Sequence, residues 1–329
     1  MKKILRYILL ATMLLVSASV FAASKKSIVC TTYPEYDWLL NVLGKNASNF
    51  NLTLLQDKGT DLHSYQPTVQ DIAKISACDL FVYVGGESDE WVEKALMNAR
   101  NKNMIVINMM EVLGDAVREE EIVEGMQESE EHEHEHGHDH EHGHDHEDEE
   151  TEYDEHVWLS LRNAVVITQA LCEVVQKLDN KNASTYKANT DSYIKQLSAL
   201  DSEYKNAVAQ AKNKTLVFAD RFPFRYLTDD YGLKYFAAFA GCSAESEASF
   251  ETIIFLAKKI DEHALGTILT IEKSNKKLAK TIVSNTKAKN QQILELDSMQ
   301  SVTKKEINDG KSYLGTMKQN LAVLKAALN

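Results

Sequence analysis

The sequence predicts an α/β protein of two lobes, each with a mainly parallel four-stranded sheet flanked by helices, joined by one long rigid helix. Short apolar runs alternate with helical patterns twice along the chain, which is typical of parallel strands covered by helices on both faces. Between the two sets, about 30 residues contain neither Pro nor Gly, which favours a single long helix. The 329 residues suffice for two hydrophobic cores.

The elements follow in chain order. The first set of predicted strands covers residues 27–33, 50–56, 79–85 and 104–109, and the second covers 215–220, 234–239, 267–272 and 292–297. An amphipathic stretch from Leu161 to Leu178 predicts a helix between them. We therefore assign residues 24–181 to the first lobe, 182–212 to the linking helix and 213–329 to the second lobe.

Residues 1–23 have the composition of a secretory signal peptide. Basic residues precede an apolar stretch from Tyr7 to Val16, and small residues follow up to Ala23. The apolar stretch is shorter than the roughly 20 residues that a membrane-spanning helix needs. Because the first cysteine, Cys30, lies inside a predicted strand, we expect a soluble periplasmic protein that is not a lipoprotein.

The cysteines do not predict a metal site by themselves. No C-x-x-C pair occurs, so a thiolate zinc site is not expected. Export would permit disulfides, but the sequence selects no pairing among the four cysteines, which are Cys30, Cys78, Cys172 and Cys242.

A histidine stands at every second position from His132 to His146, separated only by Glu, Asp and Gly. Imidazole is a common ligand of zinc-like metals, so this tract predicts weak, multivalent metal binding. We expect residues 118–153 to form a disordered loop, because the run is highly charged and has no apolar stripe. Its eight histidines are His132, His134, His136, His138, His140, His142, His144 and His146.

The negative charge of the chain is concentrated in the same segment. Residues 119–155 contain 19 Asp or Glu and no Lys or Arg, so without them the formal charge rises from −13 to about +6. The remaining charge is nearly balanced and forms no basic stripe, which argues against nucleic acid as a partner. Small cations and proteins are the expected partners.

Three histidines lie outside the tract. His63 is in GTDLHSYQPTVQD, a loop after the second predicted strand in which Thr68 and Asp71 have the spacing of a helix cap. Strand-end loops of α/β sheets bind ligands, although a surface histidine without a function would fit as well. His156, in YDEHVWLSLRN, could be a ligand or a packed imidazole, and His263 is expected to complement a helix dipole.

Several spaced segments together resemble the zinc/manganese solute-binding proteins of ABC importers, the ZnuA/TroA-like group (cluster A-I). GTDLHSYQPTVQD is similar to the family segment G-x-D-P-H-x-Y-E-P-T-x-x-D, and DEHVWLS to D-P-H-V-W-L. FPFRYLTDDYGL, LDSMQ and GKSYLGTMKQNL follow in the family order. The resemblance implies two α/β lobes joined by a long helix, with the metal bound between the lobes.

Carried over by position, the resemblance implies that His63, His156 and Asp297 are metal ligands. Arg221 stands in the column where the family has His or Glu, and a guanidinium has no lone pair for a metal. We therefore expect Asp220 to be the next ligand, although it could instead be the N-cap of a helix. Glu245 or Glu247 is the alternative ligand if Asp220 does not bind the metal.

The resemblance and the tract together predict capture of a metal, not catalysis. Two imidazoles with one or two carboxylates suit Zn²⁺, while an oxygen-richer site would suit Mn²⁺. We expect a monomeric zinc-binding protein that delivers its ion to an ABC permease and its ATPase. A manganese-binding homologue and a stand-alone metal buffer or adhesin remain alternatives, and a zinc hydrolase is disfavoured because no motif supplies a general base.

Overall fold

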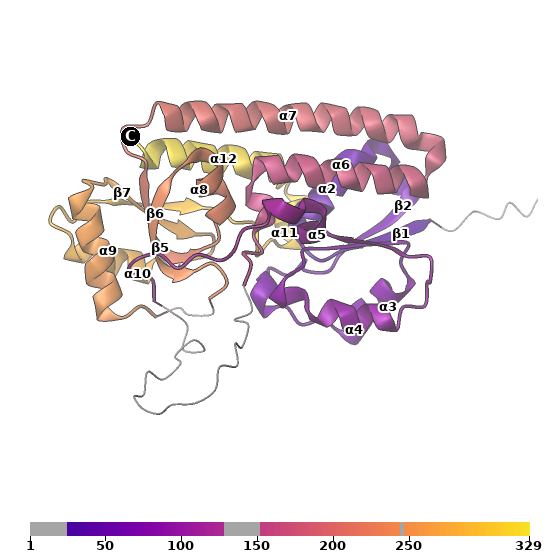
Figure 1. The fold of residues 1–329 in the computed structure, drawn as a ribbon, viewed down its shortest axis with the longest axis horizontal. Helices are drawn as coiled ribbons and strands as arrows, with labels where there is room; N and C mark the ends of the chain where they lie inside the picture. The colour runs from indigo at the N-terminus through magenta and orange to yellow at the C-terminus, as the bar shows by residue number, and fades with distance from the viewer. Residues whose placement is uncertain (1–24, 128–151, 244–246) are drawn as a thin grey trace, which may run out of the picture.

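The computed structural model describes residues 25–127, 152–243 and 247–329, which form two α/β lobes (Figure 1). The predicted signal peptide, the eight histidines of the tract and Glu245 lie outside the described residues. The predicted fold class is confirmed, with one four-stranded parallel sheet in each lobe.

The first lobe has the strand order β2-β1-β3-β4. Residues of β1 alternate between the two faces of the sheet, because Ile28 and Cys30 join the large core while Val29 packs in a smaller cluster on the other side. The strands are β1 (Lys26–Cys30), β2 (Phe50–Leu54), β3 (Leu80–Tyr83) and β4 (Ile105–Asn108). The helices are α2 (Tyr33–Leu43), α3 (Val69–Ala77), α4 (Trp91–Met97), α5 (Met109–Leu113) and α6 (Leu161–Leu178).

The second lobe repeats this arrangement in the order β6-β5-β7-β8. In β5, Leu216 and Phe218 join the large core, and Val217 and Ala219 face a separate cluster. The strands are β5 (Thr215–Phe222), β6 (Lys234–Ala240), β7 (Thr267–Ile271) and β8 (Gln292–Leu296). The helices are α8 (Arg225–Tyr231), α9 (Phe250–Glu262), α10 (Lys277–Asn285), α11 (Lys304–Asn308) and α12 (Tyr313–Ala327).

The predicted long helix is α7 (Ala183–Ala209), with 27 residues, and it runs along both lobes (Figure 1). It packs against α2 and α6 of the first lobe and α12 of the second. Asn189 donates a hydrogen bond to Val42 O at 2.9 Å, and the Tyr204 hydroxyl donates one to Met317 O at 2.6 Å. A helix fastened at both ends in this way restricts hinge motion between the lobes.

The two lobes also share buried contacts with each other. The indole N–H of Trp158 donates to Ser298 O at 2.8 Å, and the hydroxyl of Tyr313 donates to Trp158 O at 2.6 Å. Both side chains are fully buried in the large core, which contains residues of both lobes.

All four cysteines are free thiols. Within the described residues, no helix has both the length and the apolar composition needed to cross a membrane.

Candidate metal site

The two histidines selected from the sequence lie against each other, with 3.1 Å between their Nε2 atoms. His63 belongs to η2 (Leu62–Ser64), a single 3₁₀ turn after β2. Asp61 begins this turn by accepting the backbone N–H of His63 at 3.1 Å. Leu62, which stands where the family segment has Pro, is only 1% exposed and holds the turn in the core. The predicted cap of α3 by Thr68 is also present.

His156 is fully buried and precedes the turn η6 (Val157–Leu159). Asp154 accepts its backbone N–H at 2.8 Å and its Nδ1–H at 2.9 Å. Because an ionised carboxylate can only accept hydrogen bonds, Nδ1 carries the proton in the neutral imidazole. The lone pair of Nε2 then faces His63.

A second set of hydrogen bonds orients the ring of His63. Its Nδ1 lies 2.8 Å from Ser88 Oγ, and Ser88 in turn donates its hydroxyl and its N–H to Glu155. The Ser88 oxygen is therefore free to accept the Nδ1 proton, which leaves a lone pair on His63 Nε2. Glu155, which stands where the family segment D-P-H-V-W-L has Pro, is only 2% exposed. Two lone pairs 3.1 Å apart form a position for a cation, whether a proton or a metal ion.

Burial sets the charge of the two imidazoles in opposite ways. Burial, together with the neighbouring His156, lowers the pKa of His63 to about 3. Burial also works against the charged form of His156, but the Asp154 carboxylate outweighs it and holds the pKa of His156 above its ordinary value. Of the two rings, His156 therefore holds a proton more strongly than His63, and a divalent cation bound at Nε2 would displace such a proton.

A third metal-binding atom comes from the second lobe. Among the described residues, the sulfur of Cys242 and one ring nitrogen each of His63 and His156 lie within 4.8 Å of one another. Cys242 follows β6, and Gly241 allows the end of this strand to approach the first lobe. A Cβ at Gly241 would lie 2.8 Å from Phe222 O and 3.2 Å from His156 Cε1. Cys242 is not part of a C-x-x-C pair, and the available signal in the sequence was a Gly-Cys pair shortly after a predicted strand.

Gln300 of the second lobe reaches the same place. In the amide orientation that satisfies both of its polar atoms, its oxygen lies 3.0 Å from His156 Nε2. Its nitrogen donates to both carboxylate oxygens of Asp61, at 2.9 and 3.1 Å. Gln300 ends the LDSMQ segment, but the sequence did not indicate that its side chain reaches the histidines, because this depends on the turn at Met299.

Arg221 forms an ion pair across the lobes, with its Nη2 2.6 Å from Asp61 Oδ2. Burial favours the neutral form of Asp61, but Arg221 outweighs it and holds the pKa of Asp61 below its usual value. The positive charge of the Arg221 guanidinium beside the histidine pair is therefore compensated by the Asp61 carboxylate.

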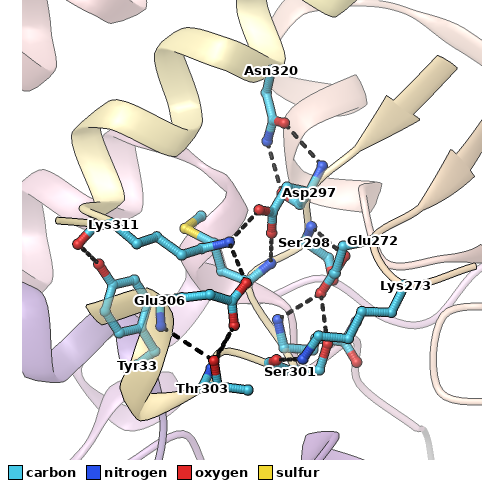
Figure 2. A network of polar contacts seen from close by, with 12 residues as sticks. Tyr33, Glu272, Lys273, Asp297, Ser298, Ser301, Thr303, Glu306, Lys311 and Asn320 are labelled. Carbon is cyan, nitrogen blue, oxygen red and sulfur yellow. Dashed lines mark hydrogen bonds and ion pairs between the residues drawn. The ribbon is translucent and has the colours of Figure 1, made fainter. Parts of the chain in front are cut away.

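The carboxylate of Asp297 points toward Lys311 (Figure 2). It forms an ion pair with Lys311, while its Oδ1 accepts the N–H of Met299 at 2.8 Å. Asn320 holds the backbone of Asp297 through two further hydrogen bonds. The chain then turns at Met299, whose φ is 62°, and this turn brings Gln300 toward the histidines instead. Within the described part of the chain, Asp297 is not a member of the metal-binding group.

Asp220 is not brought to the histidines either. It lies inside β5, and α8 begins only at Arg225, so Asp220 does not cap a helix. A bulge shifts the register of β5 between Phe218 and Arg221. Burial raises the pKa of Asp220, which lines a different cavity from the one at His63.

The remaining candidates lie at the surface. Glu247 is exposed, and no described group of possible metal ligands includes it. His263 directly follows the last residue of α9, where its imidazole suits the negative end of the helix dipole as predicted.

A cavity of about 250 Å³ opens onto His63 and Cys242. Glu120 and Glu152, from the two flanks of the histidine/acid tract, pair through a backbone hydrogen bond of 2.9 Å at this cavity. The cavity is also lined by Glu87, Ser88, Tyr153 and Glu155. This concentration of carboxyl groups favours the approach of cations.

The sequence model of the family described as zinc-uptake complex component A, periplasmic (ZnuA), matches residues 28–327. The chain belongs to the ZnuA family. Over 331 residues it is 30% identical to the high-affinity zinc uptake system protein ZnuA of Bacillus subtilis, covering 98% of this chain and 96% of that protein. The family resemblance predicted from the sequence is thereby confirmed.

Other members of the ZnuA family are similar over most of this chain. It is 29% identical to zinc-binding protein AdcA of Streptococcus pyogenes serotype M18 over 93% of its own length, but it spans only 56% of that relative. The Zn(II)-bound ZnuA-like domain of Streptococcus pneumoniae AdcA superposes with a TM-score of 0.69 at 27% identity, covering 93% of this chain and 99% of that domain. The metal-dependent lipoprotein YcdH of Bacillus subtilis gives a TM-score of 0.72 at 26% identity, with 92% and 99% covered.

Proposed function

We propose that this member of the ZnuA family captures Zn²⁺ outside the cytoplasm and delivers it to an ABC permease and its ATPase. The observation that carries the proposal is the pair of buried Nε2 lone pairs of His63 and His156, 3.1 Å apart. Nitrogen donors hold Zn²⁺ better than Mn²⁺, which prefers oxygen ligands, so manganese is the second candidate. The role is binding and release of an ion, with no bond-breaking step.

The histidine/acid tract acts in this proposal as a collector of zinc for the tight site. Its flanks support this role, because Asp154 N donates to Arg118 O at 2.9 Å and Glu120 N donates to Glu152 O at the same distance. The chain therefore enters and leaves the tract next to the cavity at His63. Weak sites tethered near a tight one raise the local concentration of the ion there.

We further propose that the protein is exported and is not anchored by a lipid. A pneumococcal relative is named zinc-binding lipoprotein AdcA. In this chain the first cysteine, Cys30, is fully buried in β1, where a lipid would disrupt the sheet. Fractionation of the expressing cells with mass spectrometry of the mature protein tests both points, and a lipid-modified form in the membrane fraction would contradict the second.

The site is tested by competition of the full chain with a chromophoric zinc chelator. Replacing the eight tract histidines by Ser in every protein removes the weak sites while keeping the chain length. In that background, His63→Ala and His156→Ala should each lower zinc affinity at least about 100-fold, or roughly 2.7 kcal/mol. His263→Ala, an exposed histidine at the end of α9, is the matched control and should bind as tightly as the parent.

Unchanged tight binding by both site variants would refute the site. Transport is tested separately by adding the zinc-loaded protein to vesicles that contain the permease and the ATPase. ATP-dependent zinc uptake that requires the protein supports delivery, whereas zinc retention without uptake would indicate a stand-alone buffer.

A further inference from the structure

We propose that Cys242 is the zinc ligand of the second lobe, as a thiolate, and that the amide oxygen of Gln300 completes the site with His63 and His156. The inference rests on the proposed function, because it concerns how the same captured zinc ion is held. It assigns to the second lobe a sulfur donor in place of the carboxylates expected from the sequence.

The donor spacings measured from His156 Nε2 fit a tetrahedral ion. Each ligand of a tetrahedral zinc lies about 2.0–2.3 Å from the metal, so the donors lie about 3–4 Å from one another. The two histidine Nε2 atoms are 3.1 Å apart, and the Gln300 oxygen is 3.0 Å from His156 Nε2. The sulfur of Cys242 lies within 4.8 Å of one ring nitrogen of each histidine, and a shift of about 1 Å brings it into range.

Three charged residues in the described part of the second lobe are paired or lie elsewhere. Arg221 has no lone pair and is paired with Asp61, and Asp297 is paired with Lys311. Asp220 lines a different cavity. Two neutral imidazoles and a neutral amide leave both positive charges of the ion uncompensated, so the site requires an anionic ligand. Among the described residues of the second lobe, Cys242 is the member of the metal-binding group and provides this charge as a thiolate.

Binding requires no oxidant or reductant. The Cys242 S–H bond breaks, its proton passes to water, and the sulfur electron pair forms the Zn–S bond. The site then carries one positive charge, close to the carboxyl groups of Asp154, Glu155 and Glu120. A thiolate also favours zinc over manganese, which gives the chain a basis for selectivity that the carboxylates of a hard-metal site would not supply.

X-ray absorption at the zinc edge tests the assignment on the full chain loaded with one equivalent of Zn²⁺. A sulfur atom at about 2.3 Å from zinc is expected beside nitrogen or oxygen atoms at about 2.0–2.1 Å. Cys242→Ser should lose the sulfur signal, whereas the matched control Cys172→Ser, in α6, should keep it. The tract cannot imitate the result, because residues 128–151 contain no cysteine.

Chelator competition separates this inference from the proposed function. Cys242→Ala should lower zinc affinity at least about tenfold and lower manganese affinity less, while circular dichroism shows that the fold is kept. If zinc binds tightly through His63 and His156, but without a sulfur signal and with no loss in Cys242→Ala, the ligand assignment is wrong and the function stands. If the wild type shows no tight zinc binding that depends on the two histidines, the proposed function itself fails.

Discussion

The ion pair between Arg221 and Asp61 should contribute measurably to the stability of the metal-free protein. Its atoms are 2.6 Å apart, and the two side chains are only 19% and 18% exposed. At an effective dielectric constant of about 20, unit charges about 4 Å apart attract by about 4 kcal/mol before desolvation is subtracted. Removing one partner of a buried pair costs about 3–5 kcal/mol, because the other charge stays buried.

Arg221→Met should therefore lower the free energy of unfolding by about 2–3 kcal/mol. This is below the full range of about 3–5 kcal/mol because Asp61 keeps two other donors, the N–H of His63 and the amide of Gln300. Asp61→Asn should cost a similar amount. The double variant should lose much less than the sum of the two single losses, because no unpaired charge remains.

Urea unfolding in the presence of a metal chelator measures these losses, since urea does not screen charges. Fluorescence and circular dichroism must give coincident transitions before a two-state free energy is assigned. The control cycle uses Lys187 and Asp191, an ion pair on α7 with side chains 66% and 52% exposed, whose coupling should stay below about 0.5 kcal/mol. If losses for the Arg221 and Asp61 variants simply add, the pair does not connect the lobes energetically and the reasoning is refuted.

Three further changes test other parts of the structure. Asp154→Asn keeps an acceptor for His156 Nδ1 but removes the charge, so zinc affinity should fall about 10- to 100-fold in a competition titration; unchanged affinity would contradict this role. Trp158→Phe removes the buried hydrogen bond to Ser298 O and should lower the urea-derived free energy of unfolding by about 1–3 kcal/mol. A loss below about 0.5 kcal/mol would show that this contact does not hold the lobes together. Burial raises the pKa of Asp37 to about 6, so the folded protein binds this proton more tightly than the unfolded chain, and stability falls as pH rises from about 4 to 6. Between about pH 4 and 6 the wild type should lose on the order of 2–3 kcal/mol of its free energy of unfolding through Asp37, and Asp37→Asn should not show this loss. If the free energies of unfolding of the two proteins change with pH in parallel, Asp37 has no such effect.

Local patterns in the sequence were enough to predict the elements of this fold. Apolar runs of strand length predict the two parallel sheets, and the Pro- and Gly-free stretch predicts α7. Boundaries were less accurate, because capping chemistry competes with strand propensity. The first predicted strand was extended to Tyr33, but Thr32 and Glu35 form a capping box and α2 begins at Tyr33.

Spaced motifs also predicted the two first-lobe histidines. His63 and His156 occur in segments that match the family pattern, and short-range contacts with Asp61 and Asp154 orient them. These contacts span only two residues of chain, so a local motif contains them. The sequence itself therefore determined the first-lobe half of the site.

The second-lobe half depended on the tertiary structure. Arg221 and Asp61 are 160 positions apart, and only the packing of the lobes makes them a pair. The bulge in β5 and the turn at Met299 decide which side chains reach the histidines, and these backbone irregularities have no periodic signal in the sequence. Cys242 and Gln300 lie in two loops of the second lobe, far from His156 in the sequence. Only the packing of the two lobes brings both residues close to His156. Residue type indicates which atoms can bind a metal, but only the path of the backbone brings them within bonding distance of one another.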